Sequence, residues 1–270
     1  MAVSVAMLIP AGAGTENVRT DTAAETPQAD TVLETVAGSN DFTYSNGVLT
    51  AYSGTDAAVT VPSGLTGIAE EVFLGCTTMT SITIPSSMKS IGEKAFSDCT
   101  KLARVSFPKR LVDFGAIYDY TLSGCSKLKS VTLPIGMINV GGHTFLNCTS
   151  LKNVTIYDGT ENILNGTFYG CTGLTEIDLP DSLVSIGNDS FKNCRNLTSI
   201  TISSDEISIG DGAFDGCGKL TIYGRPGSRA EEYANRNNIK FEDISNQANQ
   251  VTKTFNKVYG NRLRNSVQYG

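Results

Sequence analysis

The chain has 270 residues, a formal net charge of −6, 18% charged residues and no tryptophan. This mildly acidic balance argues against general nucleic-acid binding, which needs a basic face. The sequence contains no run of 18 or more apolar residues, so it predicts no membrane-spanning helix.

The first 40 residues predict an export signal followed by a linker. Residues 1–13 are mostly apolar and end in small residues, as in a secretory signal peptide cleaved after Ala13. No lysine or arginine precedes Arg19, so the basic leader is missing and we expect the start of the signal to be cut short. A mobile apolar terminus is the alternative. Residues 14–40 are rich in Thr, Ala, Glu and Asp and predict a disordered linker.

Residues 41–57 predict an N-terminal hairpin cap. Asn46-Gly47 separates two stretches in which apolar and polar residues alternate. This dipeptide is typical of the two-residue turn of a β-hairpin. The hairpin is expected to cover the first turn of the segment that follows.

Residues 58–224 contain a repeated phrase with evenly spaced cysteines. The clearest copy, Ile91 to Pro108, reads I-G-x-x-A-F-x-x-C-x-x-L-x-x-V-x-F-P. A tandem repeat of this length indicates the stacked turns of a solenoid, because one copy is too small to fold alone. The cysteines are separated by 23, 26, 23, 23, 23 and 23 residues, and they are Cys76, Cys99, Cys125, Cys148, Cys171, Cys194 and Cys217.

Each copy predicts one short strand. Pairs such as Val105 and Phe107 alternate with polar residues, which is the period of a strand with one buried face. Proline, as at Pro108 and Pro180, ends the strand because it cannot donate to the sheet. Glycines such as Gly187 are expected at the corners where the chain turns back. Stacked copies would form a parallel sheet on one face, with short β, 3-10 or loop segments on the other.

The copy between Pro108 and Cys125 contains an insertion, since its cysteine spacing is 26 residues instead of 23. Departures from a repeat map to a loop on one side, and tyrosine supplies rigid contact area for binding. Tyr118 and Tyr120 are therefore candidate binding residues. Alternatively, these rings fold back and fill the additional space.

Residues 225–244 predict a C-terminal cap. Ser228 and Glu231 have the spacing of a capping box, and the short helix that they begin is expected to end near Asn237. Residues 239–241 would add a last strand. Residues 245–270 are rich in Asn and Gln and predict a flexible polar tail. Its basic residues suit contact with an anionic wall polymer, although most tails of this type are simply solvated.

The repeated phrase resembles the bacterial leucine-rich repeats of the BspA type, also called the Treponema pallidum type. The resemblance covers residues 58–224, where the aromatic, cysteine, leucine, strand and proline positions agree across the copies. Tyr157, which replaces the proline in one copy, departs from the pattern. The resemblance implies a mainly β leucine-rich repeat solenoid in a surface protein that binds host proteins or other cells.

The cysteines predict a structural role. Each stands alone in its copy, unlike the paired cysteines of a zinc site, so we expect no metal and no cofactor. Their period predicts a column of buried thiols along the solenoid. We expect free thiols, because parallel side chains suit a disulfide poorly. Disulfides between neighbouring copies are the alternative, since export leads to an oxidising environment.

The sequence does not predict an enzyme. The single histidine, His143, occupies the same repeat position as Lys94 and Asp189, which is a turn position. No G-x-S-x-G or C-x-x-C motif accompanies it. A hydrolase that depends on His143 is the alternative of this class.

The exposed side of the predicted sheet is the main candidate site. Its residues lie between the buried ones on each strand and contribute nothing to the core, although such charges can also serve only solubility. We predict a non-enzymatic, monomeric binding module, secreted or at the bacterial cell surface, that acts in adhesion or cell-surface interaction. The alternative is a structural or targeting segment of a larger surface enzyme. The candidate residues on this sheet are Arg104, Lys129, Lys152, Asn153, Glu176 and Asp178.

Overall fold

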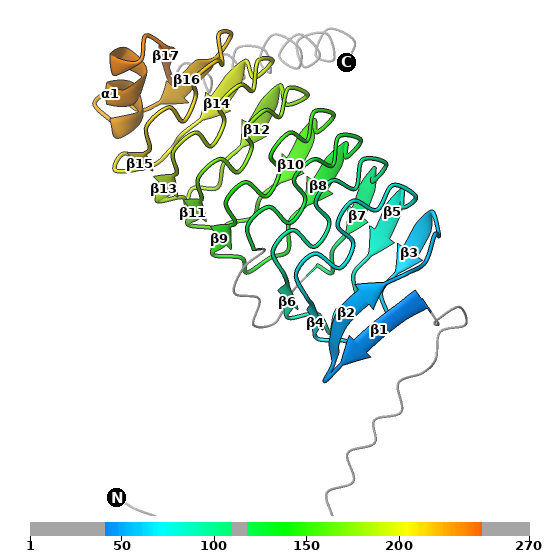
Figure 1. Cartoon of the computed structure of the whole chain (residues 1–270). Helices are drawn as coiled ribbons and strands as arrows, with labels where there is room; N and C mark the ends of the chain where they lie inside the picture. Colours follow the sequence, from blue (N-terminus) through cyan, green and yellow to red (C-terminus); the bar gives the residue numbers. More distant parts are fainter. Residues whose placement is uncertain (1–40, 110–117, 245–270) are drawn as a thin grey trace, which may run out of the picture. The chain divides into compact units, whose positions relative to one another are not determined.

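The computed structural model describes residues 41–109 and 118–244. The predicted signal (1–13), linker (14–40) and tail (245–270), and most of the insertion, lie outside these ranges. Within them, successive repeats form the turns of a β-solenoid, and each turn crosses between two faces (Figure 1). The predicted solenoid fold is confirmed.

One strand from each turn lies on what we call the main face. The strands are parallel and in register, so that Val105 of β7 lies opposite Ile82 of β5. The middle residue of each short strand points into the core, and Ile82 is fully buried. The strands of this face are β3 (Ala58–Thr60), β5 (Ser81–Thr83), β7 (Arg104–Ser106), β8 (Ser130–Thr132), β10 (Asn153–Thr155), β12 (Glu176–Asp178), β14 (Ser199–Thr201), β16 (Thr221–Gly224) and β17 (Lys240–Asp243).

Most turns also have a two-residue strand on the opposite side, which we call the second face. They correspond to the short β, 3-10 or loop segments that the sequence predicts for the face opposite the main sheet. Their second residues, such as Ile163 and Ile186, are buried in the same core. They are β4 (Gly67–Ile68), β6 (Ser90–Ile91), β9 (Asn139–Val140), β11 (Asn162–Ile163), β13 (Ser185–Ile186) and β15 (Ser208–Ile209).

Each face is divided into two sheets. On the main face, β3, β5, β7, β8 and β10 form one sheet, and β12, β14, β16 and β17 form the other. The division between β10 and β12 falls in the copy where Tyr157 replaces the proline. On the second face the division lies between β6 and β9, and the insertion lies between these strands in the sequence. Both divisions thus occur where the copies depart from the repeat pattern.

A column of aromatic rings runs through the core parallel to the strand stacking. Phe145 and Phe168 stack with their ring centroids 5.3 Å apart, and Phe168 and Phe191 stack at 5.1 Å. Stacked rings at this spacing gain about 0.5–1.5 kcal/mol beyond the burial of their area. The column is interrupted at Leu122, which occupies the aromatic position in the copy with the insertion.

The turns that connect the second face to the main face contain two left-handed residues, four positions apart. In one repeat these are His143 and Asn147, with φ of 53° and 57°, and in another they are Asp189 and Asn193, with φ of 54° and 62°. Glycine, asparagine and aspartate adopt this conformation most readily. The turns are joined by backbone hydrogen bonds, as where His143 donates to the carbonyl oxygen of Asn165 at 2.9 Å.

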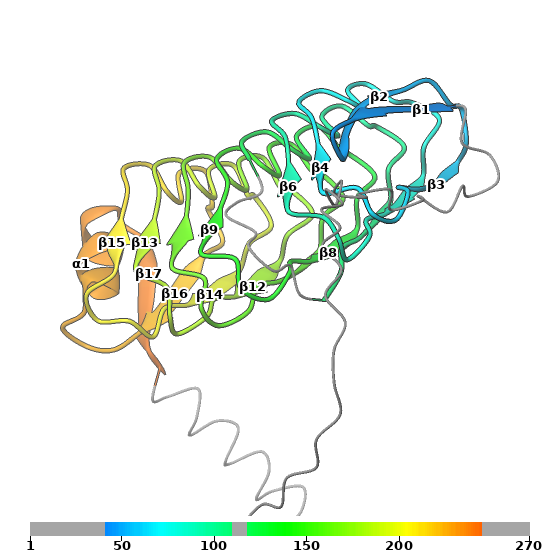
Figure 2. The same ribbon diagram turned by 90° about the horizontal axis from the view of Figure 1, so that it is seen from below.

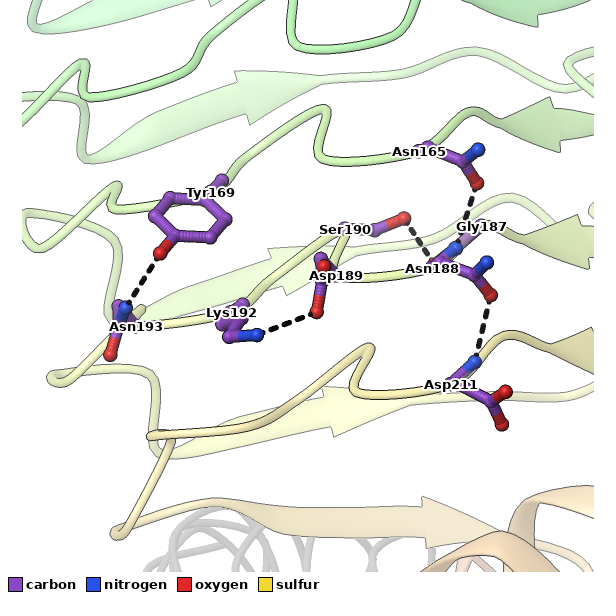
Figure 3. A network of polar contacts seen from close by, with 9 residues as sticks. All are labelled: Asn165, Tyr169, Gly187, Asn188, Asp189, Ser190, Lys192, Asn193 and Asp211. Atoms are coloured by element: carbon purple, nitrogen blue, oxygen red, sulfur yellow. Dashed lines mark hydrogen bonds and ion pairs between the residues drawn. The ribbon is translucent and has the colours of Figure 1, made fainter.

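Side chains extend this ladder between repeats (Figure 3). The backbone N–H of Asn188 donates to Oδ1 of Asn165 at 2.9 Å, and that of Asp211 donates to Oδ1 of Asn188 at 2.8 Å. Further along the same turns, Nδ2 of Asn193 donates to the hydroxyl of Tyr169 at 3.3 Å. The asparagines of the repeat therefore hold neighbouring turns together.

The glycine that follows a second-face strand is required by close packing. Gly187 was expected at a corner, but its φ is not in the left-handed region. A Cβ at this position would lie 2.7 Å from the backbone nitrogen of Asn165 and 2.8 Å from the carbonyl carbon of Leu164. Only a residue without a side chain lets the two turns approach this closely.

The hairpin caps the N-terminal end of the stack. Strands β1 (Phe42–Ser45) and β2 (Val48–Tyr52) are antiparallel, and Asn46 and Gly47 between them have φ of 51° and 75°. These values fit the predicted two-residue turn. β2 pairs with β4, so the hairpin extends the second face, and the Tyr52 ring lies 5.0 Å from Phe73.

A helix caps the C-terminal end (Figure 2). Helix α1 (Arg229–Arg236) starts at Ser228, whose Oγ accepts from the N–H of Glu231, as predicted. The Glu231 carboxylate accepts from Gly227 at 2.6 Å rather than from Ser228, because the Ser228 N–H is bonded to the Arg225 carbonyl. Tyr233 is buried against Phe214 and completes the aromatic column.

Candidate binding surface

The outward residues of the main face form two columns along the solenoid. Arg104 lies opposite Ser81 on one side and Ser130 on the other, and Thr155 lies opposite Thr132. Beyond the division of the sheet, Glu176 lies opposite Ser199. These columns agree with the alternation of buried and polar residues in the sequence.

The basic candidates lie on three consecutive turns. Arg104 begins β7, while Lys129 and Lys152 immediately precede β8 and β10. Lys152 donates its backbone N–H to the carbonyl oxygen of Lys129 at 2.9 Å, which fixes the two lysines on adjacent turns. All three side chains are exposed. Among the described residues, none of the three forms an ion pair.

The acidic candidates begin the second sheet of the main face. Glu176 and Asp178 are the outward residues of β12, and Ile177 between them is buried. Both carboxylates are exposed, and no ion pair joins them to another described residue. Asn153 is the first outward residue of β10, the neighbouring turn. The sheet division therefore separates the basic turns from the acidic turn.

The two candidate tyrosines do not belong to this surface. Tyr118 is 52% exposed and directly follows the part of the insertion outside the described residues. Tyr120 has a left-handed φ of 57° and occupies the turn position equivalent to that of His143. Its ring stacks on the imidazole at 4.7 Å with an interplanar angle of 5°. Tyr120 therefore packs against the next turn.

A hollow of about 370 Å³ lies beside this stacked pair and includes Asp119 and Asn165 in its lining. Oδ1 of Asp119 accepts from the N–H of Gly142, and Oδ1 of Asn165 accepts from Asn188, so both side chains serve the turns. No described carboxylate, hydroxyl or thiol is hydrogen-bonded to the His143 imidazole. The hollow contains no arrangement of nucleophile and base among the described residues.

The thiols lie in a column beside the aromatic rings. All seven are free, six are buried, and Cys76 in the first copy is half-buried. Burial raises the pKa of Cys99 and of Cys148 to about 12, because a thiolate would lose its hydration there. Thiols that hold their proton so strongly are poor nucleophiles and poor metal ligands.

The described part of the chain contains no group of three His, Cys, Asp or Glu side chains arranged to hold a metal ion. A second hollow of about 470 Å³ lies between the last repeat and the C-terminal cap and is lined by residues such as Cys217, Lys219 and Asn238.

None of the described helices is long and apolar enough to cross a membrane.

Two further basic residues next to the predicted ones were missed in the sequence. Lys101 and Lys127 are exposed and lie in the segments that lead into β7 and β8. They occupy the same position of the repeat, directly before the buried leucines Leu102 and Leu128. Aligning the copies by this position, and not only by the strand, would have found them.

Stacked turns with a parallel main face, buried leucines and a cap at each end define a leucine-rich repeat solenoid. The BspA type leucine rich repeat region matches residues 51–171 and 115–241 in six copies. The chain belongs to the family of BspA-type leucine-rich repeat proteins, and the predicted resemblance is confirmed.

Solved structures similar to this chain come from several bacteria. The leucine-rich repeat protein of T. pallidum is 27% identical with a TM-score of 0.63, over 76% of this chain and 96% of that one. A leucine-rich cell surface protein of Faecalibacterium prausnitzii is 24% identical with a TM-score of 0.47, over 66% and 62%. A leucine-rich repeat protein of Bacteroides ovatus is 25% identical with a TM-score of 0.40, over 68% of each chain. No curated protein matches the chain.

Proposed function

We propose that the chain is an exported, non-enzymatic binding module that presents its main face to a protein or glycan at a cell surface, as in adhesion. One observation carries this proposal: the charged outward side chains of β7 and β12, and the lysines directly before β8 and β10, are exposed and have no ion-pair partner among the described residues. Membership of a family implicated in surface attachment supports it.

The main face suits recognition because its geometry is fixed before a partner arrives. Each strand is held in register by its neighbours, and the buried middle residues, such as Val105 and Val131, anchor it to the core. A surface that does not need to become ordered on binding loses less conformational entropy. Residues on this face can vary without disturbing the buried layers, which suits a role in specificity.

The surroundings of His143 favour a binding module over a hydrolase. Its ring is stacked on Tyr120, and a Cβ at Gly166 in the next turn would collide with it. The imidazole is thus held in the stack of turns. A general base needs a nucleophile within hydrogen-bonding distance, and no described side chain provides one.

The absence of tryptophan provides a direct test of which face binds. Thr132→Trp places a single fluorophore on the main face, and Glu161→Trp places one on the second face, where Glu161 is exposed. Both variants would be titrated with a panel of extracellular-matrix proteins and cell-surface glycans. We expect a partner to change the emission of the Thr132→Trp variant only.

Two results would contradict the proposal. A partner that perturbs only the second-face fluorophore would move the site away from the main face. If no member of the panel bound to the unmodified chain, measured by surface plasmon resonance, the adhesion role would be refuted. Circular dichroism of both variants provides the control that the solenoid remains folded.

A further inference from the structure

A basic patch lies on three consecutive turns of the main face, those of β7, β8 and β10. It consists of exposed side chains on β7 or in the segments that lead into β7, β8 and β10, whereas the chain as a whole has a net charge of −6. Adjacent strands of a sheet lie about 4.8 Å apart, so the charges repeat at short, regular intervals along the solenoid. The members of the basic patch are Lys101, Arg104, Lys127, Lys129 and Lys152.

The patch has no internal compensation. The outward residues of these strands are Arg104 with neutral serines, threonines and Asn153, and none is a carboxylate. Three lysines outside the patch are paired: Lys94 contacts Glu93, Lys192 contacts Asp189 and Lys240 contacts Glu242. No member of the patch forms an ion pair or a side-chain hydrogen bond with a described residue. Clustered like charges repel one another, so an anion that neutralises them is bound favourably.

The rest of the surface indicates which anion fits. The outward positions from β5 to β14 contain no apolar or aromatic side chain. Protein interfaces usually have an apolar or aromatic centre, and single-stranded nucleic acids require aromatic platforms. Hydroxyl and amide groups beside cations, such as Thr132 and Asn153, instead suit a hydroxyl-rich polymer with anionic substituents.

We propose that the basic patch binds a linear acidic glycan, carrying sulfate or carboxylate groups, laid across β7, β8 and β10. This inference rests on the proposed binding role of the main face and names its ligand. Lys and Arg supply charge-assisted hydrogen bonds to the anionic groups. The neutral columns contact the sugar hydroxyls.

The acidic turn sets one end of this site. Glu176 and Asp178 follow the patch directly, on β12, where the main face passes into its second sheet. An anionic polymer is repelled there, which confines it to the first sheet. Neutralising the two carboxylates should therefore increase the affinity for an anionic glycan. A substitution that acted only through folding or solubility would not increase this affinity.

The test uses the full chain and heparin as the sulfated probe, with dextran as the uncharged probe. The variant Arg104→Gln/Lys129→Gln/Lys152→Gln should bind heparin about tenfold more weakly, and Glu176→Gln/Asp178→Asn about twofold more tightly. A matched control, Lys89→Gln/Arg195→Gln/Lys219→Gln, removes the same charge from exposed positions outside the patch and should leave the affinity unchanged. Affinity should fall as salt is raised.

Several outcomes would overturn the inference. Equal loss of affinity in the patch variant and the matched control would show that only net charge matters. Binding of polyglutamate or duplex DNA as tightly as heparin would show an unspecific attraction to polyanions. A matrix protein that perturbs the fluorophore of the Thr132→Trp variant, together with no affinity for heparin, would refute the glycan and leave the proposed function standing.

Discussion

The Cys171 thiol donates a hydrogen bond to the carbonyl oxygen of Phe145, 3.1 Å away in the preceding repeat. The same oxygen accepts the backbone N–H of Cys148 at 3.0 Å, so both of its lone pairs are used. The pattern recurs at Cys194 with Phe168. This position therefore favours a side chain that is small, apolar and able to donate one weak hydrogen bond.

Replacing Cys171 by alanine should destabilise the solenoid. The Cys171→Ala variant loses the sulfur from a fully buried site and leaves a Phe145 lone pair without its donor. We expect the free energy of unfolding to fall by about 1–3 kcal/mol, measured by urea titration. Cys76→Ala is the control, since Cys76 is half-buried and bonded only to Thr78, and it should cost less than about 0.5 kcal/mol.

The native protein should show one accessible thiol. Cys76 is the only half-buried cysteine of the seven, and the other six are buried. A thiol reagent such as DTNB should therefore react first with Cys76, and with the remaining thiols only as the chain unfolds. The Cys76→Ser variant should remove the fast phase. Fewer than seven reactive thiols in denaturant without reductant would instead reveal disulfides.

Stability should decrease at alkaline pH because of the buried thiols. The pKa of Cys148 is raised to about 12 in the folded chain by burial, whereas an unfolded thiol titrates near pH 8.5. Between these values the unfolded state binds fewer protons, so the free energy of unfolding falls as pH rises. Each such thiol contributes up to about 1.4 kcal/mol per pH unit. Below about pH 8 the thiols are protonated in both states, so their ionisation should contribute little to the pH dependence of stability.

The alkaline effect is measured by guanidinium titrations from pH 8 to pH 10.5 in the presence of a reductant. The free energy of unfolding of the Cys148→Ala variant should fall less steeply with pH than that of the unmodified chain. An identical slope in both proteins would show that Cys148 keeps an ordinary pKa in the fold.

Substituting Gly187 should be much more harmful than substituting Gly218. A Cβ at Gly187 would lie 2.6 Å from Oδ1 of Asn165, whereas nothing lies within 4 Å of one at Gly218. We expect Gly187→Ala to cost more than about 2 kcal/mol and Gly218→Ala to stay within about 0.5 kcal/mol. Thermal unfolding followed by circular dichroism compares the two. Equal melting temperatures would show that the turns can separate at no cost.

The features of the fold that have a repeated or a local sequence signal were predictable. The cysteine spacing established the solenoid, Asn46-Gly47 predicted the hairpin turn, and Ser228 with Glu231 predicted the helix start. Each of these signals is local. The alternation around Val105 likewise placed Arg104 on the outside of the main face.

Features that depend on contacts between turns were not predictable. The second face was predicted only as short β, 3-10 or loop segments, because a two-residue strand is too short for a periodic signal. Its strands depend on pairing between neighbours such as Ile163 and Ile186. The thiol bond from Cys171 to Phe145 joins residues that are 26 positions apart. The stacking of Tyr120 on His143 also joins different copies, so no local pattern in the sequence indicated it.

The hydrogen bonds, ring stacks and strand pairs described above join each turn only to its immediate neighbours, and most turns have the same length. A genetic deletion or duplication of one 23-residue unit, from Cys148 to Gly170, would therefore leave turns of equal length next to one another, and their strands could still pair. Because this unit contains Lys152, its duplication would add another cation to the row. The length of the main face can thus evolve in whole steps, by recombination between the protein's own copies.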